Sequence, residues 1–258
     1  MTKFSANLGF LWSDRSLIDA IYAAHAAGFE TVECHWPYAY DAAEVKAALD
    51  ATGLTMLGLN TVRGNLAANE NGLAALPGRE DEARAGIDQA LCYAAAINTP
   101  NIHVMAGFAE GSAAEDCFIE NLRYATSQQQ HVTFLIEPLN HYDAPGYFLN
   151  STDQARRIIE AVAAPNLKLM FDCYHIQILE GDLTRRLQAN IDIIGHIQFA
   201  GVPSRGRPDY GEINYQHIFK QIADMGYTAP LGAEYKPENG DTDGSLGWKS
   251  KLEEQAGI

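Results

Sequence analysis

The chain has 258 residues, and its 33 acidic residues outnumber its 18 basic ones, which gives a formal charge of −15. This length is typical of one α/β barrel and lies near the upper limit for a single hydrophobic core. A surface of this sign repels phosphate backbones, and no basic run offsets it, so nucleic acid is not an expected partner.

Short β-rich apolar runs alternate with longer helical patterns along the chain. Strands are predicted near residues 4–8, 30–34, 55–60, 101–105, 132–137, 167–172, 194–200 and 230–235. Helices are predicted near residues 14–27, 42–52, 79–97, 113–130, 152–163, 176–190, 215–225 and 243–254. Eight alternating pairs are typical of parallel strands joined by crossover helices.

Local signals support these boundaries. Asp41 and Glu44 have capping-box spacing ahead of one predicted helix, and Gly53 follows it as a stop. No linker or shift in composition divides the chain, and no glycine-rich phosphate turn follows the first strand. We therefore predict an α/β fold, a single (β/α)8 TIM barrel over residues 1–258, rather than two domains or an open doubly wound sheet.

The longest irregular stretch is Thr61–Gly78, which follows the third predicted strand. A loop of this length inside a compact domain usually has a function or moves. Loops after barrel strands surround the active site, so we expect this one over the mouth of the barrel.

Four consecutive predicted strands end in side chains that carry oxygen: Glu137, Asp172, Gln198 and Glu234. Their separations of 35, 26 and 36 residues each match about one strand–helix unit. Because the carboxyl ends of barrel strands meet at one face, the four side chains should converge there.

Three carboxylates and one amide suit a hard divalent cation, Mg²⁺ or Mn²⁺, which prefers oxygen ligands. The cation would also offset the mutual repulsion of the carboxylates. Taken singly, each of these residues could equally be a helix cap, a salt-bridge partner or an ordinary hydrogen-bonding residue. Their joint placement favours a site for one divalent metal.

Other polar residues lie where a substrate would bind. His175 follows Asp172 by three residues, and His103 and Asn60 close the fourth and third predicted strands. Arg205 lies in the loop after the seventh strand, where a guanidinium could hold a substrate carboxylate through two hydrogen bonds. Each also has an ordinary interpretation, as a core histidine, a capping residue or a solvated loop charge.

Seven short segments occur together in the order found in one known family: GLAALPGRE (72–80), HVMAG (103–107), IEPLN (136–140), FDCYH (171–175), HIQ (196–198), GEINY (211–215) and EYKP (234–237). In these segments the chain resembles the hydroxypyruvate isomerase family of the xylose-isomerase-like barrels. The resemblance implies a barrel, a divalent metal and a pair of glutamates that move a proton between adjacent carbons.

The resemblance also implies individual roles. The residues that match its metal ligands are Glu137, Asp172, Gln198 and Glu234. Glu137 and Glu234 match the acid/base pair as well. His175, by its D-x-x-H spacing, matches a histidine that binds the substrate near its carbonyl in the related ketose 3-epimerases, and Arg205 matches a substrate-contacting arginine. The epimerases place histidine where this chain has Gln198, which favours the isomerase branch.

Two segments depart from the family pattern. CHWPYAY (34–40) stands where a more apolar FLFPY-like segment is expected, and NTVRGN (60–65) replaces an NLP-GD-like segment. Both lie where the substrate should bind. They leave the metal chemistry in place and keep the identity of the substrate open.

The predicted reaction interconverts a small 2-oxo or hydroxy acid and its aldehyde or ketone isomer through an enediolate. Hydroxypyruvate and tartronate semialdehyde are the first-choice pair, and a 2-oxo-tetronate is the second. One glutamate would remove the carbon-bound proton and the other would return one to the neighbouring carbon.

Three other activities are alternatives to this reaction. Ketose 3-epimerisation uses the same proton chemistry on a longer neutral sugar. An endonuclease of the same superfamily would need several zinc ions, many histidine ligands and a basic groove, whereas this chain has eight histidines and a charge of −15. A non-catalytic sugar-binding barrel would bind ligand without exchanging its protons.

The four cysteines, at positions 34, 92, 117 and 173, form no CxxC pair and indicate reduced thiols. The first residues have no signal-peptide layout, and no apolar stretch reaches membrane-spanning length. We therefore expect a cytoplasmic protein that acts on a small molecule without a membrane, either alone or as a homo-oligomer.

Overall fold

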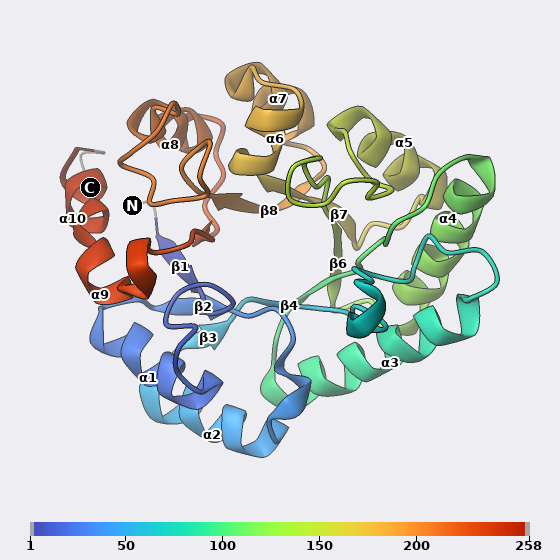
Figure 1. Ribbon diagram of the computed structural model, residues 1–258, viewed down its shortest axis with the longest axis horizontal. Helices are drawn as coiled ribbons and strands as arrows, with labels where there is room; N and C mark the ends of the chain where they lie inside the picture. Colours follow the sequence, from blue (N-terminus) through green and yellow to red (C-terminus); the bar gives the residue numbers. More distant parts are fainter. Residues whose placement is uncertain (1–2, 256–258) are drawn as a thin grey trace.

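The computed structural model describes residues 3–255, with side chains to residue 252 (Figure 1). Among these residues, nine strands form one sheet in the order β3-β2-β1-β9-β8-β7-β6-β5-β4, and every pair is parallel. The strands are β1 (Phe4–Asn7), β2 (Thr31–Glu33), β3 (Thr55–Met56), β4 (Gly58–Asn60), β5 (Asn101–His103), β6 (Thr133–Ile136), β7 (Leu167–Asp172), β8 (Ile194–Phe199) and β9 (Leu231–Ala233).

Helices surround the strands as an outer ring (Figure 1). The α-helices are α1 (Leu17–Ala26), α2 (Ala42–Thr52), α3 (Glu80–Ile97), α4 (Ser112–Gln128), α5 (Thr152–Val162), α6 (Cys173–Leu179), α7 (Leu183–Asn190), α8 (Tyr215–Asp224), α9 (Thr242–Ser245) and α10 (Gly247–Gln255). Three 3₁₀ turns are η1 (Pro37–Ala39), η2 (Leu66–Ala68) and η3 (Glu238–Gly240). None of the helices between residues 3 and 255 has both the length and the apolar character that a membrane crossing requires.

The predicted strand at 55–60 is divided in two. The two strands are separated at Leu57, whose N–H still donates to Val32 O at 2.7 Å while its carbonyl accepts from the Asn101 side chain at 2.7 Å. β3 therefore pairs with β2, and β4 pairs with β5. Hydrogen bonds from Cys34 N to Gly58 O at 3.1 Å and from Asn60 N to His35 O at 2.8 Å continue the pairing of the β2 segment onto β4, which closes the barrel. The eight-unit barrel predicted from the sequence is confirmed.

Two predicted helices are also divided. The helix expected at 176–190 starts earlier, at α6, where Asp172 caps the first turn, and it stops at Gly181 and Asp182 before α7 begins. Both of these residues have left-handed backbone angles, with φ of +65° and +49°, which a continuous helix does not allow. The helix expected at 243–254 is likewise two helices, α9 and α10. The ends of the predicted domain, residues 1–2 and 256–258, lie outside the described residues.

Aromatic packing fixes the last helix to the barrel. Trp248 of α10 is fully buried, and its ring centroid lies 5.1 Å from that of Phe4 and 5.4 Å from that of Phe199. Phe199 also packs edge-on against Phe219 of α8 at 4.9 Å. Edge-to-face rings at these distances stabilise beyond their buried area. The first strand, β8, α8 and α10 are thus joined in one apolar cluster.

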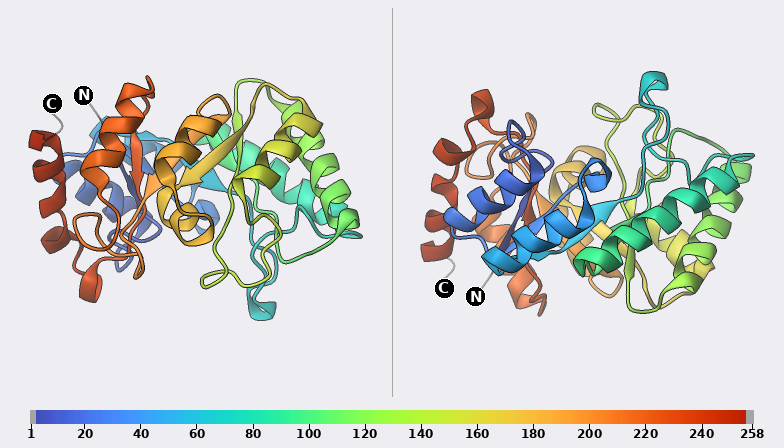
Figure 2. Two further views of the ribbon diagram at one scale, coloured as in Figure 1. Left: turned by 90° about the horizontal axis from the view of Figure 1, so that it is seen from above. Right: turned by 90° about the horizontal axis from the view of Figure 1, so that it is seen from below.

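The long segment 61–78 extends beyond the strands at one end of the barrel, with η2 at its outer part (Figure 2). Its return path is tied to the chain after β5, because the backbone N–H of Ala75 donates to the carbonyl of Ala106 at 2.8 Å. Gly72 passes so close that a Cβ there would lie 2.6 Å from the backbone of Met105. The segment therefore needs glycine at this crossing.

Candidate active site

A cavity of about 400 Å³ opens at the carboxyl ends of the strands. Its walls include six of the residues predicted for the site: Asn60, His103, Glu137, His175, Arg205 and Glu234. The other two predicted residues, Asp172 of β7 and Gln198 of β8, lie opposite each other in the strand register, and neither forms part of the walls of this cavity. The structure thus brings the predicted site residues to one face of the barrel, as strand-end positions require.

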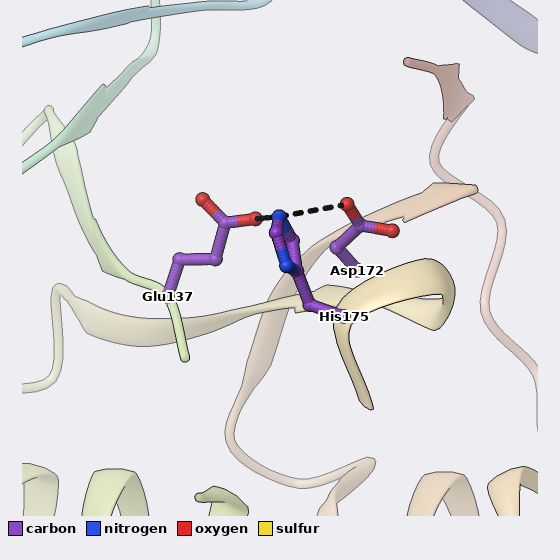
Figure 3. A group of neighbouring side chains, drawn as sticks. All are labelled: Glu137, Asp172 and His175. Atoms are coloured by element: carbon purple, nitrogen blue, oxygen red, sulfur yellow. Dashed lines mark ion pairs between the residues drawn. The ribbon is translucent and has the colours of Figure 1, made fainter. Parts of the chain in front are cut away.

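Glu137, Asp172 and His175 form the closest cluster of potential metal ligands (Figure 3). One potential ligand atom from each lies within 4.8 Å of the others, and all three residues are buried. The Nε2 atom of His175 is 3.7 Å from Asp172 Oδ2 and 4.0 Å from Glu137 Oε1. In Figure 3 the two carboxylates point toward the imidazole from opposite sides.

The hydrogen bonds of His175 define which ring nitrogen carries its proton. Its Nδ1 atom accepts from the backbone N–H of Asn140 at 3.0 Å and from the Asn140 side-chain amide at 2.8 Å. That amide is oriented by its oxygen, which accepts from the backbone N–H groups of Tyr142 and Asp143. Burial and the charge of Arg205 lower the pKa of His175 well below its ordinary value, so the ring is neutral. Its Nε2 therefore carries the proton and presents a donor, which cannot serve as a metal ligand in this tautomer.

Glu234, directly after β9, is held at both carboxylate oxygens. Its Oε1 accepts from the Asn7 side chain at 2.9 Å and from His35 Nε2 at 2.7 Å. Its Oε2 accepts from Arg205 at 2.7 Å. Side chains from β1, the loop after β2 and the loop after β8 thus fix the orientation of this carboxylate.

Arg205 is almost fully buried, at 9% exposure, and its guanidinium contacts three carboxylates. Besides Glu234, its nitrogen atoms lie 3.1 Å from Asp143 and 3.4 Å from Asp172. Its backbone has a φ of +54°, in the left-handed region that is unfavourable for arginine. Such backbone strain is found mainly at functional sites, where the surrounding structure enforces it.

The two glutamates differ in proton affinity. Burial, reinforced by the charges of Glu234 and Asp172, raises the pKa of Glu137 well above its ordinary value. Burial also raises the pKa of Asp172 to about 7, although the charge of Arg205 opposes this shift. For Glu234 burial acts in the same direction, but Arg205 and the His35 hydrogen bond outweigh it and lower the pKa to about 2. In this arrangement Glu137 holds a proton far more tightly than Glu234 does.

Gln198 is oriented by a buried residue on the opposite side of the barrel. Its side-chain N–H₂ donates to Glu33 Oε2 at 2.7 Å, and His196 Nε2 lies 3.1 Å from the same carboxylate. The Glu33 side chain crosses over Gly232 of β9, where a Cβ would lie 2.4 Å from its Oε1. This hydrogen bond fixes the amide nitrogen of Gln198. The amide oxygen is buried and has no hydrogen-bond partner within residues 3–252.

The donor set fits a divalent cation. Glu137 Oε1 and Gln198 Oε1 are buried oxygen atoms without a hydrogen-bond partner among the described side chains, and such atoms are costly unless a ligand satisfies them. The carboxylates of Glu137, Asp172 and Glu234 also converge here, and Arg205 contacts two of them, Asp172 and Glu234. The closest cluster contains Glu137 and Asp172 but not Glu234, so the four-residue ligand ring stays a prediction.

The sequence search missed several residues of this site. Asn7 and Glu33 are the last residues of β1 and β2, and they lie side by side in the register of those strands. Both positions were predictable from the sequence, because a polar side chain at the carboxyl end of a barrel strand points toward the active site. Asp143 gives no such signal, because it lies in an irregular loop, although it lines the cavity and pairs with Arg205.

A parallel barrel with buried carboxylates around one strand-end cavity defines an enzyme that handles a small polar substrate. The chain belongs to the xylose isomerase-like TIM barrel family, whose sequence profile matches residues 21–253. It is 47% identical to the 2-oxo-tetronate isomerase of Cupriavidus necator, over 96% of this chain and 97% of that protein. It is 39% identical to the hydroxypyruvate isomerase of Escherichia coli, over 96% of this chain and 98% of that protein. The predicted resemblance and the predicted class, an isomerase, are confirmed.

Solved structures share the fold. A crystal structure from Brucella melitensis, described as an AP endonuclease of family 2, matches with a TM-score of 0.94 and 38% identity, covering 97% of this chain and 99% of that one. A D-psicose 3-epimerase from Clostridium cellulolyticum matches with a TM-score of 0.76 and 19% identity, covering 99% of this chain and 96% of that one. At 19% identity, the likeness to the epimerase concerns the barrel alone.

Proposed function

We propose that this protein is a divalent-metal-dependent isomerase that interconverts a small 2-oxo or hydroxy acid and its aldehyde or ketone isomer. The observation that carries the proposal is the pair of buried glutamates, Glu137 after β6 and Glu234 after β9, that border one cavity beside a histidine N–H donor. The similarity to a 2-oxo-tetronate isomerase at 47% identity supports a four-carbon acid, and the hydroxypyruvate isomerase relatives support the three-carbon one.

The residues of the chain divide the work of this reaction. Glu137 and Glu234 would exchange a proton with two adjacent carbons of the substrate, one as base and the other as acid. The Nε2–H of His175 would donate to the substrate oxygen that becomes negative as the proton leaves. A divalent cation held by Glu137, Asp172, Gln198 and Glu234 would polarise the substrate oxygens and acidify the neighbouring C–H bond. Arg205 would keep the Glu234 carboxylate in its position.

Deuterium exchange tests this proposal directly. We expect the protein with Mn²⁺ or Mg²⁺ in D2O to convert hydroxypyruvate or a 2-oxo-tetronate and to incorporate deuterium at carbon, as measured by NMR. Neutral ketoses such as fructose and psicose should exchange slowly or not at all. Exchange of the ketoses alone would instead indicate a 3-epimerase, and ligand binding without any exchange would indicate a non-catalytic barrel.

Glu33 is not a proposed metal ligand, but it orients one of them, Gln198, and so provides a test of the metal site. Glu33→Ala should weaken Mn²⁺ binding by roughly 10- to 100-fold, because Gln198 loses the acceptor that orients its amide. Mn²⁺ titration followed by electron paramagnetic resonance measures this affinity. Glu30→Ala, which removes an exposed glutamate paired with Lys3, is the matched control and should leave the affinity unchanged. A folded Glu33→Ala protein with the Mn²⁺ affinity of the wild type would contradict the prediction.

A further inference from the structure

Arg63 is a cation at the cavity that has no acidic partner among the described side chains. It lies in the segment 61–78 and forms part of the cavity wall. Within residues 3–252 its guanidinium has no ion pair, and its Nε atom is buried without a hydrogen-bond partner. A buried donor of this kind is costly unless a ligand accepts its hydrogen bond. In a chain with a charge of −15, an unpaired arginine facing a cavity indicates an anionic ligand.

The position of Arg63 is fixed before any ligand binds. Its guanidinium carbon lies 4.9 Å from the centre of the Trp36 ring, a stacked cation–π arrangement. The Trp36 ring is anchored in turn, since its Nε1–H donates to the carbonyl of Thr61 at 3.1 Å. The carbonyl of Arg63 accepts from the backbone N–H of Gly72 at 2.9 Å. Within residues 3–252 the guanidinium of Arg63 makes no hydrogen bond, so its fork of N–H donors is available to a carboxylate.

Lys236 adds a second positive charge to the same cavity. Its ammonium lies 5.4 Å from the centre of the Phe10 ring, and it also has no ion pair within residues 3–252. Its backbone N–H donates to the carbonyl of Arg205 at 2.7 Å, which places it next to the residues around Glu234. Two unpaired cations thus face the ligand space above a set of acidic side chains.

Arg205, the residue predicted from the sequence to hold a substrate carboxylate, has different surroundings. Its nitrogen atoms contact the carboxylates of Asp143, Asp172 and Glu234. A substrate carboxylate would have to replace at least one of these partners at the guanidinium. Arg63 requires no such exchange.

We propose that Arg63, stacked on Trp36, binds the carboxylate of the substrate and thereby selects 2-oxo acids over neutral ketoses. The inference rests on the proposed isomerase function and names the residue that determines its substrate class. The glutamates hold one end of the substrate at the strand ends, and Arg63 holds the acidic end at the cavity wall. Lys236 strengthens the preference for an anion without replacing the two-point contact of a guanidinium.

The test compares two inert compounds that differ only at one end. Threonate and threitol share three hydroxyl-bearing carbons, but threonate ends in a carboxylate where threitol ends in an alcohol. Ligand-observed NMR titration measures the affinity of each for the Mn²⁺-loaded protein. The variants are Arg63→Gln, which removes the charge, Arg63→Lys, which keeps the charge but not the fork, and Arg185→Gln, an exposed arginine as the control.

We expect Arg63→Gln to weaken threonate binding by roughly 10- to 100-fold, the usual effect of losing hydrogen bonds to a charged group. Threitol binding and Mn²⁺ affinity should not change. The threonate affinity of Arg63→Lys should lie between those of the wild type and Arg63→Gln, and the threonate affinity of Arg185→Gln should equal that of the wild type.

Equal effects of Arg63→Gln on threonate and threitol would overturn the proposal, as would a wild type without preference for threonate. Loss of the preference in Arg205→Gln but not in Arg63→Gln would assign the carboxylate to Arg205 instead. Failure of the isomerase proposal has a separate signature, because it is the absence of deuterium exchange in any acid substrate. That result leaves the ratio of threonate to threitol affinity measurable.

Discussion

Glu137→Gln and Glu234→Gln should each reduce isomerase turnover by on the order of 10²- to 10⁴-fold, the usual contribution of a positioned acid or base. The amide that replaces either carboxylate keeps an oxygen in nearly the same place but cannot accept a proton from carbon. Both side chains are buried at the cavity, at 5% exposure each, so water does not readily take over their function. Steady-state kinetics on hydroxypyruvate and a 2-oxo-tetronate measures the loss.

The two variants should also fail in different ways. The variant that lacks the base for a given substrate should neither exchange that substrate's proton with D2O nor form product. The variant that lacks the acid should still exchange the proton while it makes little product. The roles should swap when the reverse substrate is supplied, because the proposed mechanism assigns one glutamate to each of the two carbons.

A matched control for these variants is Glu115→Gln, which alters an exposed pair with Arg157 and should retain full activity. Metal content must be equal in all proteins, since an amide ligand carries no charge. Near-normal turnover by both metal-loaded variants would exclude the two-glutamate mechanism.

Removal of divalent metal should abolish isomerisation, and addition of Mn²⁺ or Mg²⁺ should restore it. Without the cation, burial and neighbouring carboxylates raise the pKa values of Glu137 and Asp172, and the Oε1 atoms of Glu137 and Gln198 have no hydrogen-bond partner within residues 3–252. A cation at 100 times its dissociation constant stabilises a folded protein by about 2.7 kcal/mol. For a chain of this size the thermal midpoint should therefore rise by about 5–10 °C on metal addition.

Differential scanning calorimetry with and without EDTA checks the stability, and elemental analysis checks the metal content. Asp172→Ala should show a much smaller metal-dependent shift in thermal midpoint, because it removes one of the proposed ligands. Full activity in protein shown to be free of metal would contradict this prediction and remove the cation from the proposed mechanism.

Much of the fold and of the site could be predicted because both depend on strand periodicity. The position of Glu137, Asp172, Gln198 and Glu234 follows from where a strand stops, and apolar runs mark that point in the sequence. The break at Leu57 was not predictable, because the apolar run continues through it and the Asn101 side chain that bonds there belongs to the next strand.

The hydrogen bonds within the site could not be predicted from the sequence either. The proton on His175 Nε2 depends on how the loop after β6 presents Asn140. The contacts of Arg205 and the stacking of Arg63 depend on loop conformations that no periodic pattern encodes. Contacts between residues distant in sequence decide these details, and local patterns do not report them.

The anchoring of segment 61–78 bears on how such barrels diverge. Most of the bonds that tie this segment to β5 and the chain after it are between main-chain atoms, and the exceptions are the Thr61 hydroxyl, which accepts from Met105 N at 3.1 Å, and the close approach at Gly72. Mutations at loop positions other than Thr61 and Gly72 can therefore accumulate without disturbing the strand ends. A new substrate preference could arise by replacing a loop residue while the proton-transfer machinery is inherited intact. Transplanting this segment between barrels of the family would show whether exchange of this one loop transfers the preference for acidic substrates.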